Sequence, residues 1–303
     1  VTINNGNIDQ ELYYCNGQDG GDSNWSFALM RGGTPYPRLA NAANGGGRHS
    51  GVTRWGQLGF RSASVSVPTD PFGDMSGVGY FPLTNTFTNK SVGYTQYNGT
   101  NTSGTYTAEG ITWASVGAHG FRIPAPDGVS IGEWFQGNQD WAISLVFKMD
   151  ANPGTATNRA LIHMSNNDDH ARPAFWVTGP NRGAGIANKM EWFSSSNGSS
   201  WNIARGDTDP SGLGSTTIAA DTKYHVVFTR SGSSGLKGYV NKTLDWSDSN
   251  TASHYASGDY EINIGAWFVY SASYGWHGSI KNVRFFRKNL SSSEVNQLYT
   301  LDF

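Results

Sequence analysis

The clearest pattern of apolar and polar positions lies between Trp141 and Met149. Apolar side chains occupy every second position: Trp141, Ile143, Leu145, Phe147 and Met149. Successive side chains of a β-strand point to opposite faces, so a period of two predicts a strand with one face in a core.

Further short apolar runs follow along the chain, separated by segments rich in Gly, Asn and Ser. The runs are 161–164, 174–177, 190–193, 224–228 and 236–240. No long helical period lies between them. Many short strands at this spacing predict a two-layer antiparallel sandwich.

The last two runs predict a β-hairpin. The connection Ser231–Gly235 consists of Gly and Ser only, and Gly accepts the positive φ that a tight reversal needs.

One helix is predicted, near residue 300. Ser291 and Glu294 have the spacing of a capping box, in which each side chain bonds a free backbone N–H of the first turn. Val295, Leu298 and Tyr299 then fall on one face of a short helix.

The hairpin and the segments after it resemble laminin G-like, concanavalin A-like jelly-roll domains. In that family an aromatic-His-Val-Val run leads through a turn to a strand of the Leu-x-x-Tyr-Val-Asn type, and the matching residues here are Tyr224–Val227 and Leu236–Asn241. Further matching segments are 79–83, 262–265, 278–286 and 290–295. The resemblance implies an all-β, two-layer antiparallel jelly-roll sandwich over 71–303, serving as a binding or structural module rather than a catalyst.

Residues 1–70 differ from the rest of the chain. Residues 41–47 are Asn, Ala and Gly only and predict a loop, whereas 11–15, 25–30 and 62–67 favour strands. A stiff connector with two prolines, 68–74, ends this region. Two interpretations stay open: a small N-terminal arm that attaches to a partner or a neighbouring copy, or extra strands on the main domain.

Composition narrows the class of protein. Charged residues make up 15% of the chain and aromatic residues 13%, with 39 Gly, which favours strands and polar turns over helices. A formal net charge of −2 without a basic block argues against a nucleic-acid partner. No apolar run approaches the ~20 residues of a membrane helix, and the single cysteine, Cys15, permits no intrachain disulfide.

Catalytic motifs are missing. The Glu-x-Asp-x-x-Glu strand of laminarinase-type hydrolases is absent, and so is a Gly-x-Ser-x-Gly nucleophile elbow. We therefore expect no enzyme and no catalytic residues. A carboxylate pair assembled across strands, such as Glu191 with Asp168 or Asp169, is the alternative.

The densest group of oxygen ligands is Asn166, Asp168 and Asp169. Side-chain oxygens at this density suit calcium, so a structural calcium ion is a hypothesis for this segment. The alternative is a polar turn, because Asn and Asp bond their own backbone in turns.

Large rings concentrate between 266 and 276. Trp267, Tyr270, Tyr274 and Trp276 stand where the resembling family has a short polar loop. Such rings can stack on sugars or dock on a protein, and Trp192, Trp201 and Trp246 are candidates to reach the same edge. The alternative is that the rings cover the core.

Three functions follow as hypotheses. The first is a non-enzymatic virion-surface protein, a capsid decoration or tail-associated adhesin, that contacts virion proteins or its own copies through 1–70 and binds cell-surface glycan. Low charge, one cysteine and the Gly/Asn-rich first segment favour this phage hypothesis and a location on the virion surface or outside the cell. The second is a free bacterial lectin, and the third is a polysaccharide-degrading enzyme.

Overall fold

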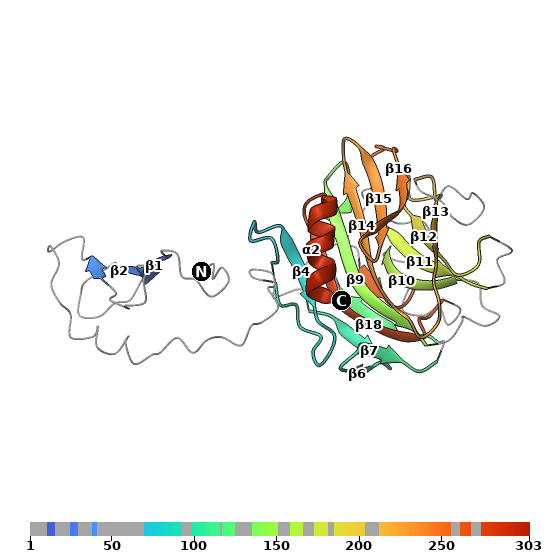
Figure 1. Cartoon of the computed structure of the whole chain (residues 1–303), viewed down its shortest axis with the longest axis horizontal. Coiled ribbons are helices and arrows are strands. Elements are labelled where there is room, and N and C mark those ends of the chain that lie inside the picture. The colour runs from blue at the N-terminus through green and yellow to red at the C-terminus, as the bar shows by residue number, and fades with distance from the viewer. Residues whose placement is uncertain are drawn as a thin grey trace. The chain divides into compact units, whose positions relative to one another are not determined.

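The structure of the chain is a computed structural model. It describes residues 11–15, 25–29, 38–40, 70–91, 98–115, 117–124, 135–150, 158–165, 173–180, 185–203, 212–255, 261–267 and 274–303. The chain divides into two compact units, Val1–Pro68 and Thr69–Phe303. Figure 1 colours the described elements in chain order.

The described part of the first unit is a small antiparallel sheet. Its order is β1-β2-β3, with bounds Glu11–Cys15, Trp25–Leu29 and Arg38–Ala40. The strands predicted at 11–15 and 25–30 are confirmed as β1 and β2. The strand predicted at 62–67 lies outside the described residues.

In the described part of the second unit, antiparallel strands form two sheets. The seven-stranded sheet has the order β13 (Leu213–Thr217), β12 (Lys189–Phe193), β11 (Ala174–Thr178), β10 (Asn158–Ser165), β17 (Glu261–Ile264), β8 (Gly120–Ile123) and β5 (Thr100–Thr102). The eight-stranded sheet has the order β16 (Thr243–Asp248), β15 (Gly235–Val240), β14 (Lys223–Ser231), β9 (Trp141–Met149), β18 (Gly278–Phe286), β7 (Gly110–Trp113) and β6 (Thr105–Thr107), with β4 (Gly77–Phe81) also pairing with β18. The predicted jelly-roll sandwich is confirmed.

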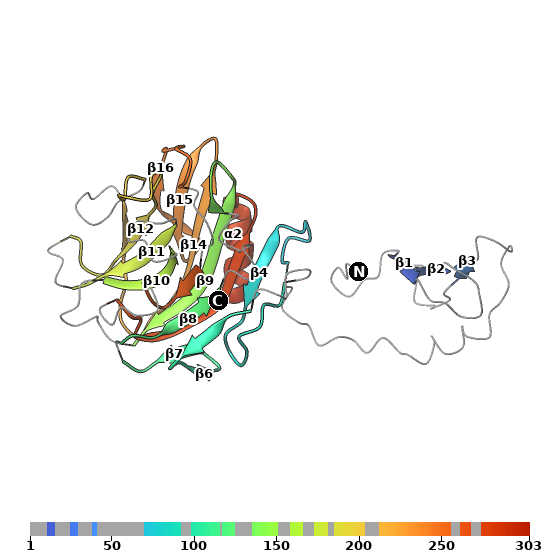
Figure 2. The ribbon, with the colours of Figure 1, turned by 180° about the vertical axis from the view of Figure 1, so that it is seen from behind.

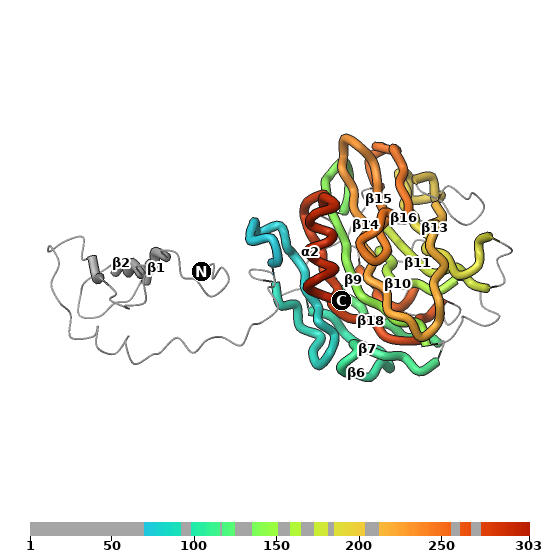
Figure 3. The backbone as a smooth tube through the Cα atoms, viewed as in Figure 1, coloured from blue at the N-terminus to red at the C-terminus, as the bar shows by residue number. Residues whose placement is uncertain are grey.

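Three long strands form the centre of the eight-stranded sheet. β9 pairs with β14 along one edge and with β18 along the other, and Figure 3 shows these strands running side by side. The alternating side chains of β9, from Trp141 to Met149, all lie in the main core between the sheets. The strand therefore has the bounds and the buried face that its period-two pattern predicts.

A glycine makes room for one of the indole rings of the core. Trp192 of β12 reaches across to β15, where a Cβ on Gly238 would lie 2.4 Å from Cε2 of the indole. The ring also contacts Phe228, with the two centroids 5.0 Å apart. The missing side chain at position 238 thus allows an indole from one sheet to fill the gap above the other.

The outer face of the eight-stranded sheet is covered by helix α2 (Ser292–Asp302). Ser291 caps it, and both hydrogen bonds of the predicted capping box are present. Val295 and Leu298 are fully buried in a second apolar cluster, together with Val227 and Phe286 of the sheet. The predicted helix is confirmed, and Figure 2 shows it against the strands from behind.

A buried ion pair joins the end of the helix to the sheet. The Nε and Nη2 atoms of Arg284 donate to the two carboxylate oxygens of Asp302 over 2.7 and 2.9 Å. Both side chains have no exposed surface. The guanidinium also lies over the ring of Tyr80, 3.7 Å from its centroid. Burial raises the pKa of Asp302, although the bonds from Arg284 act in the opposite direction.

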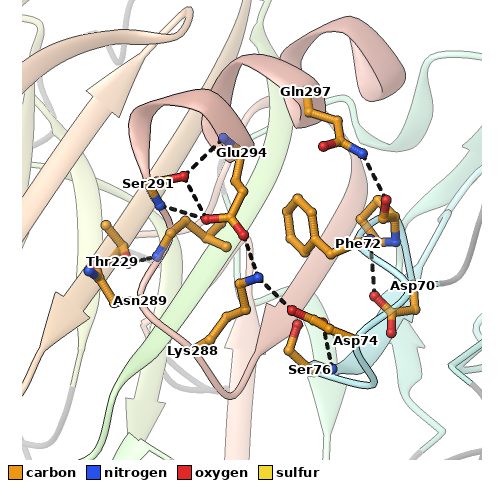
Figure 4. Close-up of polar contacts among 12 residues, drawn as sticks. Asp70, Phe72, Asp74, Ser76, Thr229, Lys288, Asn289, Ser291, Glu294 and Gln297 are labelled. Atoms are coloured by element: carbon orange, nitrogen blue, oxygen red, sulfur yellow. Dashed lines mark hydrogen bonds and ion pairs between the residues drawn. The ribbon is translucent and has the colours of Figure 1, made fainter.

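The first residues of the second unit are clamped to the same helix (Figure 4). Lys288 donates to Asp74 over 2.6 Å and is also paired with Glu294. Gln297 donates to the carbonyl oxygen of Pro71 over 2.8 Å. Burial alone would raise the pKa of Asp74, but the hydrogen bonds from Lys288 and Ser76 outweigh it and hold the pKa below its ordinary value.

We predict that Asp302→Asn lowers the free energy of unfolding by about 3–5 kcal/mol, because it leaves the buried Arg284 charge without its counter-ion. Glu109→Gln is the control. It removes an ion pair with Lys223 in which the Glu109 side chain is 48% exposed, so it costs at most about 1 kcal/mol. Urea unfolding of the full chain measures both, and equal losses in the two variants would contradict the prediction.

Candidate functional site

The outer face of the seven-stranded sheet carries a layer of aromatic side chains. Along β11, Phe175 and Val177 point into the core, so Trp176 points outward. Phe193 of β12 does the same, and the two ring centroids lie 4.9 Å apart. Trp176 and Phe193 are at most 4% exposed, which means that other groups cover this face. Figure 1 shows β11 and β12 on the opposite side of the sandwich from α2.

Three partly buried rings, Trp201, Trp267 and Tyr274, pack on this layer. Tyr274 lies edge-on to Trp267 with centroids 4.2 Å apart, and each ring contacts Trp176 at 5.3–5.4 Å. Trp201 contacts Phe193 at 5.1 Å. We call these five rings the aromatic cluster.

Backbone hydrogen bonds fix the segment that carries Tyr274. The amide of Ala160 in β10 donates to the carbonyl oxygen of Tyr274 over 3.0 Å. Trp276 donates to the carbonyl oxygen of Gly265 over 2.8 Å. The ring of Tyr274 is therefore held against the sheet by its own main chain.

A histidine lies under the cluster. His163 of β10 has no exposed surface, and its ring centroid is 6.0–6.3 Å from those of Trp176, Trp201 and Trp267. Burial lowers its pKa from 6.5 to about 3, against the effect of a hydrogen bond with the backbone of Trp267. The imidazole is therefore neutral near pH 7.

Polar side chains lie next to the aromatic cluster on the same outer face of the seven-stranded sheet. His163 is directly opposite Asn263 of β17, and Asn263 is opposite Arg122 of β8. Arg122 forms an ion pair with Glu261. On the other side of Trp176, the buried carboxylate of Glu191 accepts a hydrogen bond from Asn158 over 2.8 Å. The face thus combines stacking surfaces with hydrogen-bonding groups.

The structure brings together two of the predicted ligand residues, Trp267 and Tyr274. Trp276 lies elsewhere: it is fully buried in the main core, with its ring 5.3 Å from that of Phe147. It has no face open to a ligand, so we remove it from the candidate site. Tyr270 lies outside the described residues.

The other predicted tryptophans divide in the same way. Trp201 reaches the cluster, whereas Trp192 and Trp246 belong to the main core. Sequence reasoning missed Trp176 and Phe193. His163 was expected to be a packed sheet residue, with a site shared with Asp168 as the alternative; it is fully buried in β10, and Asp168 lies outside the described residues. The signal for Trp176 was the unbroken apolar run 174–177, because a strand that is apolar at every position is buried on both faces.

The predicted calcium ligands Asn166, Asp168 and Asp169 lie outside the described residues, so calcium stays a prediction. The same holds for the suggested pairing of Glu191 with Asp168 or Asp169. Within the described ranges, no cluster of three or more His, Cys, Asp or Glu side chains could hold a metal ion. Among the residues that the structure describes, no helix has the length and apolar character needed to cross a membrane.

A family model described as the concanavalin A-like lectin/glucanases superfamily matches residues 120–296. The chain belongs to this superfamily. A search of curated proteins finds no match to its sequence.

Solved structures share the superfamily fold at low identity. Domain 4 of the extracellular GH43 arabinanase AbnA from Geobacillus stearothermophilus, in complex with arabinotriose, is 18% identical with a TM-score of 0.51, and the match covers 74% of this chain and 98% of that one. Trypanosoma rangeli sialidase with 2,3-difluorosialic acid is 16% identical with a TM-score of 0.56, covering 98% and 45%. The binding domain of botulinum neurotoxin serotype D is 12% identical with a TM-score of 0.50, covering 75% and 52%. The chain thus spans about half the length of the last two.

The expectation that the protein is not an enzyme needs correction. Domain 4 of the arabinanase and less than half of the sialidase chain share this fold, and both proteins are glycoside hydrolases. The absence of a laminarinase-type strand and of a nucleophile elbow was therefore too narrow a reason to exclude catalysis in a superfamily described by both lectins and glucanases.

The buried histidine predicts a pH dependence of stability. Between its folded pKa of about 3 and its ordinary 6.5, His163 binds a proton only in the unfolded chain. The free energy of unfolding therefore decreases through His163 as the pH falls from about 6.5 toward 3, by up to about 1.4 kcal/mol per pH unit. His163→Phe should make this loss shallower.

Denaturant unfolding between pH 8 and pH 4 measures the effect. His225 keeps part of the slope in the variant, because burial lowers its pKa to about 3 as well. Above pH 7.5 the two stability curves should run parallel, which serves as the internal control. Equal slopes below pH 6.5 would show that His163 does not titrate as stated.

Proposed function

We propose that the protein binds glycans on the aromatic cluster. The observation that carries this proposal is the set of three partly exposed rings, Trp201, Trp267 and Tyr274, held on a buried aromatic layer. The proposal concerns binding, a step that lectins and glycoside hydrolases share.

Stacking is the physical basis. The C–H faces of a sugar ring are apolar, and they pack on the faces of Trp and Tyr, whose polar tips remain able to bond hydroxyl groups. Trp176 and Phe193 fix the positions of the three outer rings from below. A rigid platform loses little conformational freedom when a ligand binds.

The relatives support this proposal. The superfamily is described by lectins and glucanases, and domain 4 of the arabinanase was solved with arabinotriose. At 18% identity the likeness gives the fold alone, so the ligand of that domain is a first probe and is not carried over as the ligand of this chain.

We predict that replacing Trp267 and Tyr274 together by Ala lowers glycan affinity by tenfold or more, since stacking on aromatic side chains accounts for roughly 0.5–1.5 kcal/mol per ring pair beyond burial. Affinity electrophoresis in native gels that contain arabinan, xylan or laminarin measures retardation of the full chain.

Phe303→Ala is the matched control. Phe303 is an exposed ring that stacks on Tyr299 of α2, so it belongs to the helix side of the sandwich. Retardation should survive this change. If the double variant migrates like the unchanged protein in every gel that retards it, the cluster is not the binding site.

We also propose a second function, which the separate first unit motivates. Residues 1–70 attach the protein to a virion or another assembly, and the second unit, which we propose binds glycans, is displayed there. The division of the chain after Pro68 is the supporting observation.

We predict that the full chain self-associates, whereas a chain beginning at Thr69 is monomeric. Sedimentation velocity of both distinguishes them, and two monomers would remove the argument for attachment through this unit.

A further inference from the structure

A polar strip lies beside the aromatic cluster on the same sheet face. It consists of Arg122 on β8 and of Glu261 and Asn263 on β17. The neighbours of Asn263 in its own strand, Ile262 and Ile264, point into the main core, so its side chain is on the outer face. Trp267 follows three residues after the end of β17, which places strip and cluster on one continuous segment.

Asn263 is unusual because its amide is buried and unsatisfied. The side chain is 1% exposed, and neither its oxygen nor its nitrogen has a hydrogen-bond partner among the described residues. The indole N–H of Trp176 and the Nε atom of Arg122 are likewise buried without a hydrogen-bond partner, as are core groups such as the indole N–H of Trp141, but Asn263 is the described side-chain amide in which both polar atoms are unsatisfied. Each such group lowers stability, and native proteins keep few of them without a function.

The charges of the strip balance. Arg122 is paired with Glu261, and their side chains are 35% and 28% exposed, so the strip opens to solvent beside Asn263. Buried His163, opposite Asn263, carries no charge near pH 7. Two further charged groups lie on the outer face of β12, the acid Glu191 and the base Lys189, so this part of the face is also balanced. Among the residues of this face that the structure describes, no unbalanced cation is therefore available to attract a sugar carboxylate or sulfate.

We propose that Arg122, Glu261 and Asn263 form the hydroxyl-binding part of the site, and that its ligand class is neutral glycans rather than sialylated or uronic-acid glycans. This inference rests on the proposed function of the aromatic cluster.

The chemistry of the strip matches neighbouring hydroxyl groups. A hydroxyl both donates and accepts, and the Asn263 amide offers one acceptor and one donor group side by side. The balanced Arg122–Glu261 pair adds charge-assisted bonds without favouring an anion. A sugar that stacks on Trp267 and reaches Asn263 would satisfy an amide that has no hydrogen-bond partner among the described residues.

The test is Asn263→Leu, a change of similar volume that removes both polar atoms. If the amide serves a ligand, the melting temperature of the full chain is unchanged or rises by about 2–4 °C, while retardation by the neutral polysaccharide that binds best weakens by about tenfold or more. Asn89→Leu is the control. Asn89 is equally buried, but its oxygen accepts from Tyr80 and Ser91, so this change should lower the melting temperature.

The outcomes separate this inference from the proposed function. Gels with arabinan, xylan and laminarin are compared with gels containing polygalacturonate or polysialic acid, and stronger retardation by the acidic polymers overturns the ligand class. If Asn263→Leu lowers the melting temperature as Asn89→Leu does, the amide is structural and the inference fails. If Asn263→Leu leaves binding intact while the Trp267 and Tyr274 double variant abolishes it, the proposed role of the polar strip is wrong. The proposal that glycans bind on the aromatic cluster then stands. If neither change affects binding, both proposals fail.

Discussion

An antiparallel sheet in a sandwich buries one face against its partner, and its other face must be either polar or covered. Here both outer faces carry apolar side chains, including Val227 and Phe286 on one sheet and Trp176 and Phe193 on the other. That constraint determines the remaining architecture. A helix covers the first face through Val295 and Leu298, and a layer of aromatic rings covers the second.

Buried polar groups lie under both coverings, and their hydrogen bonding differs. On the helix side the buried charge of Arg284 meets Asp302 in a two-bond ion pair, so that layer is fixed by matched groups. On the ring side, the amide of Asn263 and the indole N–H of Trp176 have no hydrogen-bond partner within the described ranges. Unsatisfied groups also occur in the core, at the indole N–H of Trp141, and on the helix side, at Nδ1 of His225. The face where we propose binding is therefore one of several places where polar satisfaction is incomplete.

The sequence predicted the fold well because its signals are local. Period-two alternation placed β9, and the Ser291 capping box placed α2. The candidate site was predicted only in part. Trp267 and Tyr274 were found as a dense run of rings, but Trp276 in the same run belongs to the core. Which ring faces inward depends on strand register and on hydrogen bonds such as that between Ala160 and Tyr274, which no local pattern encodes. Trp176, Phe193 and Asn263 join the site through pairing of strands far apart in sequence.

The position of β18 also sets the order in which the protein can be assembled. Residues 278–286 occupy the middle of the eight-stranded sheet, between β9 on one side and β4 and β7 on the other. During synthesis those earlier strands emerge from the ribosome well before the strand that joins them. Until then the sheet has a gap with two open edges, and open edges are sites of aggregation. Folding of the sandwich is therefore delayed until some two hundred residues after β4 have been made, on the order of 10–40 s at usual synthesis rates, and nascent chains need protection throughout that interval.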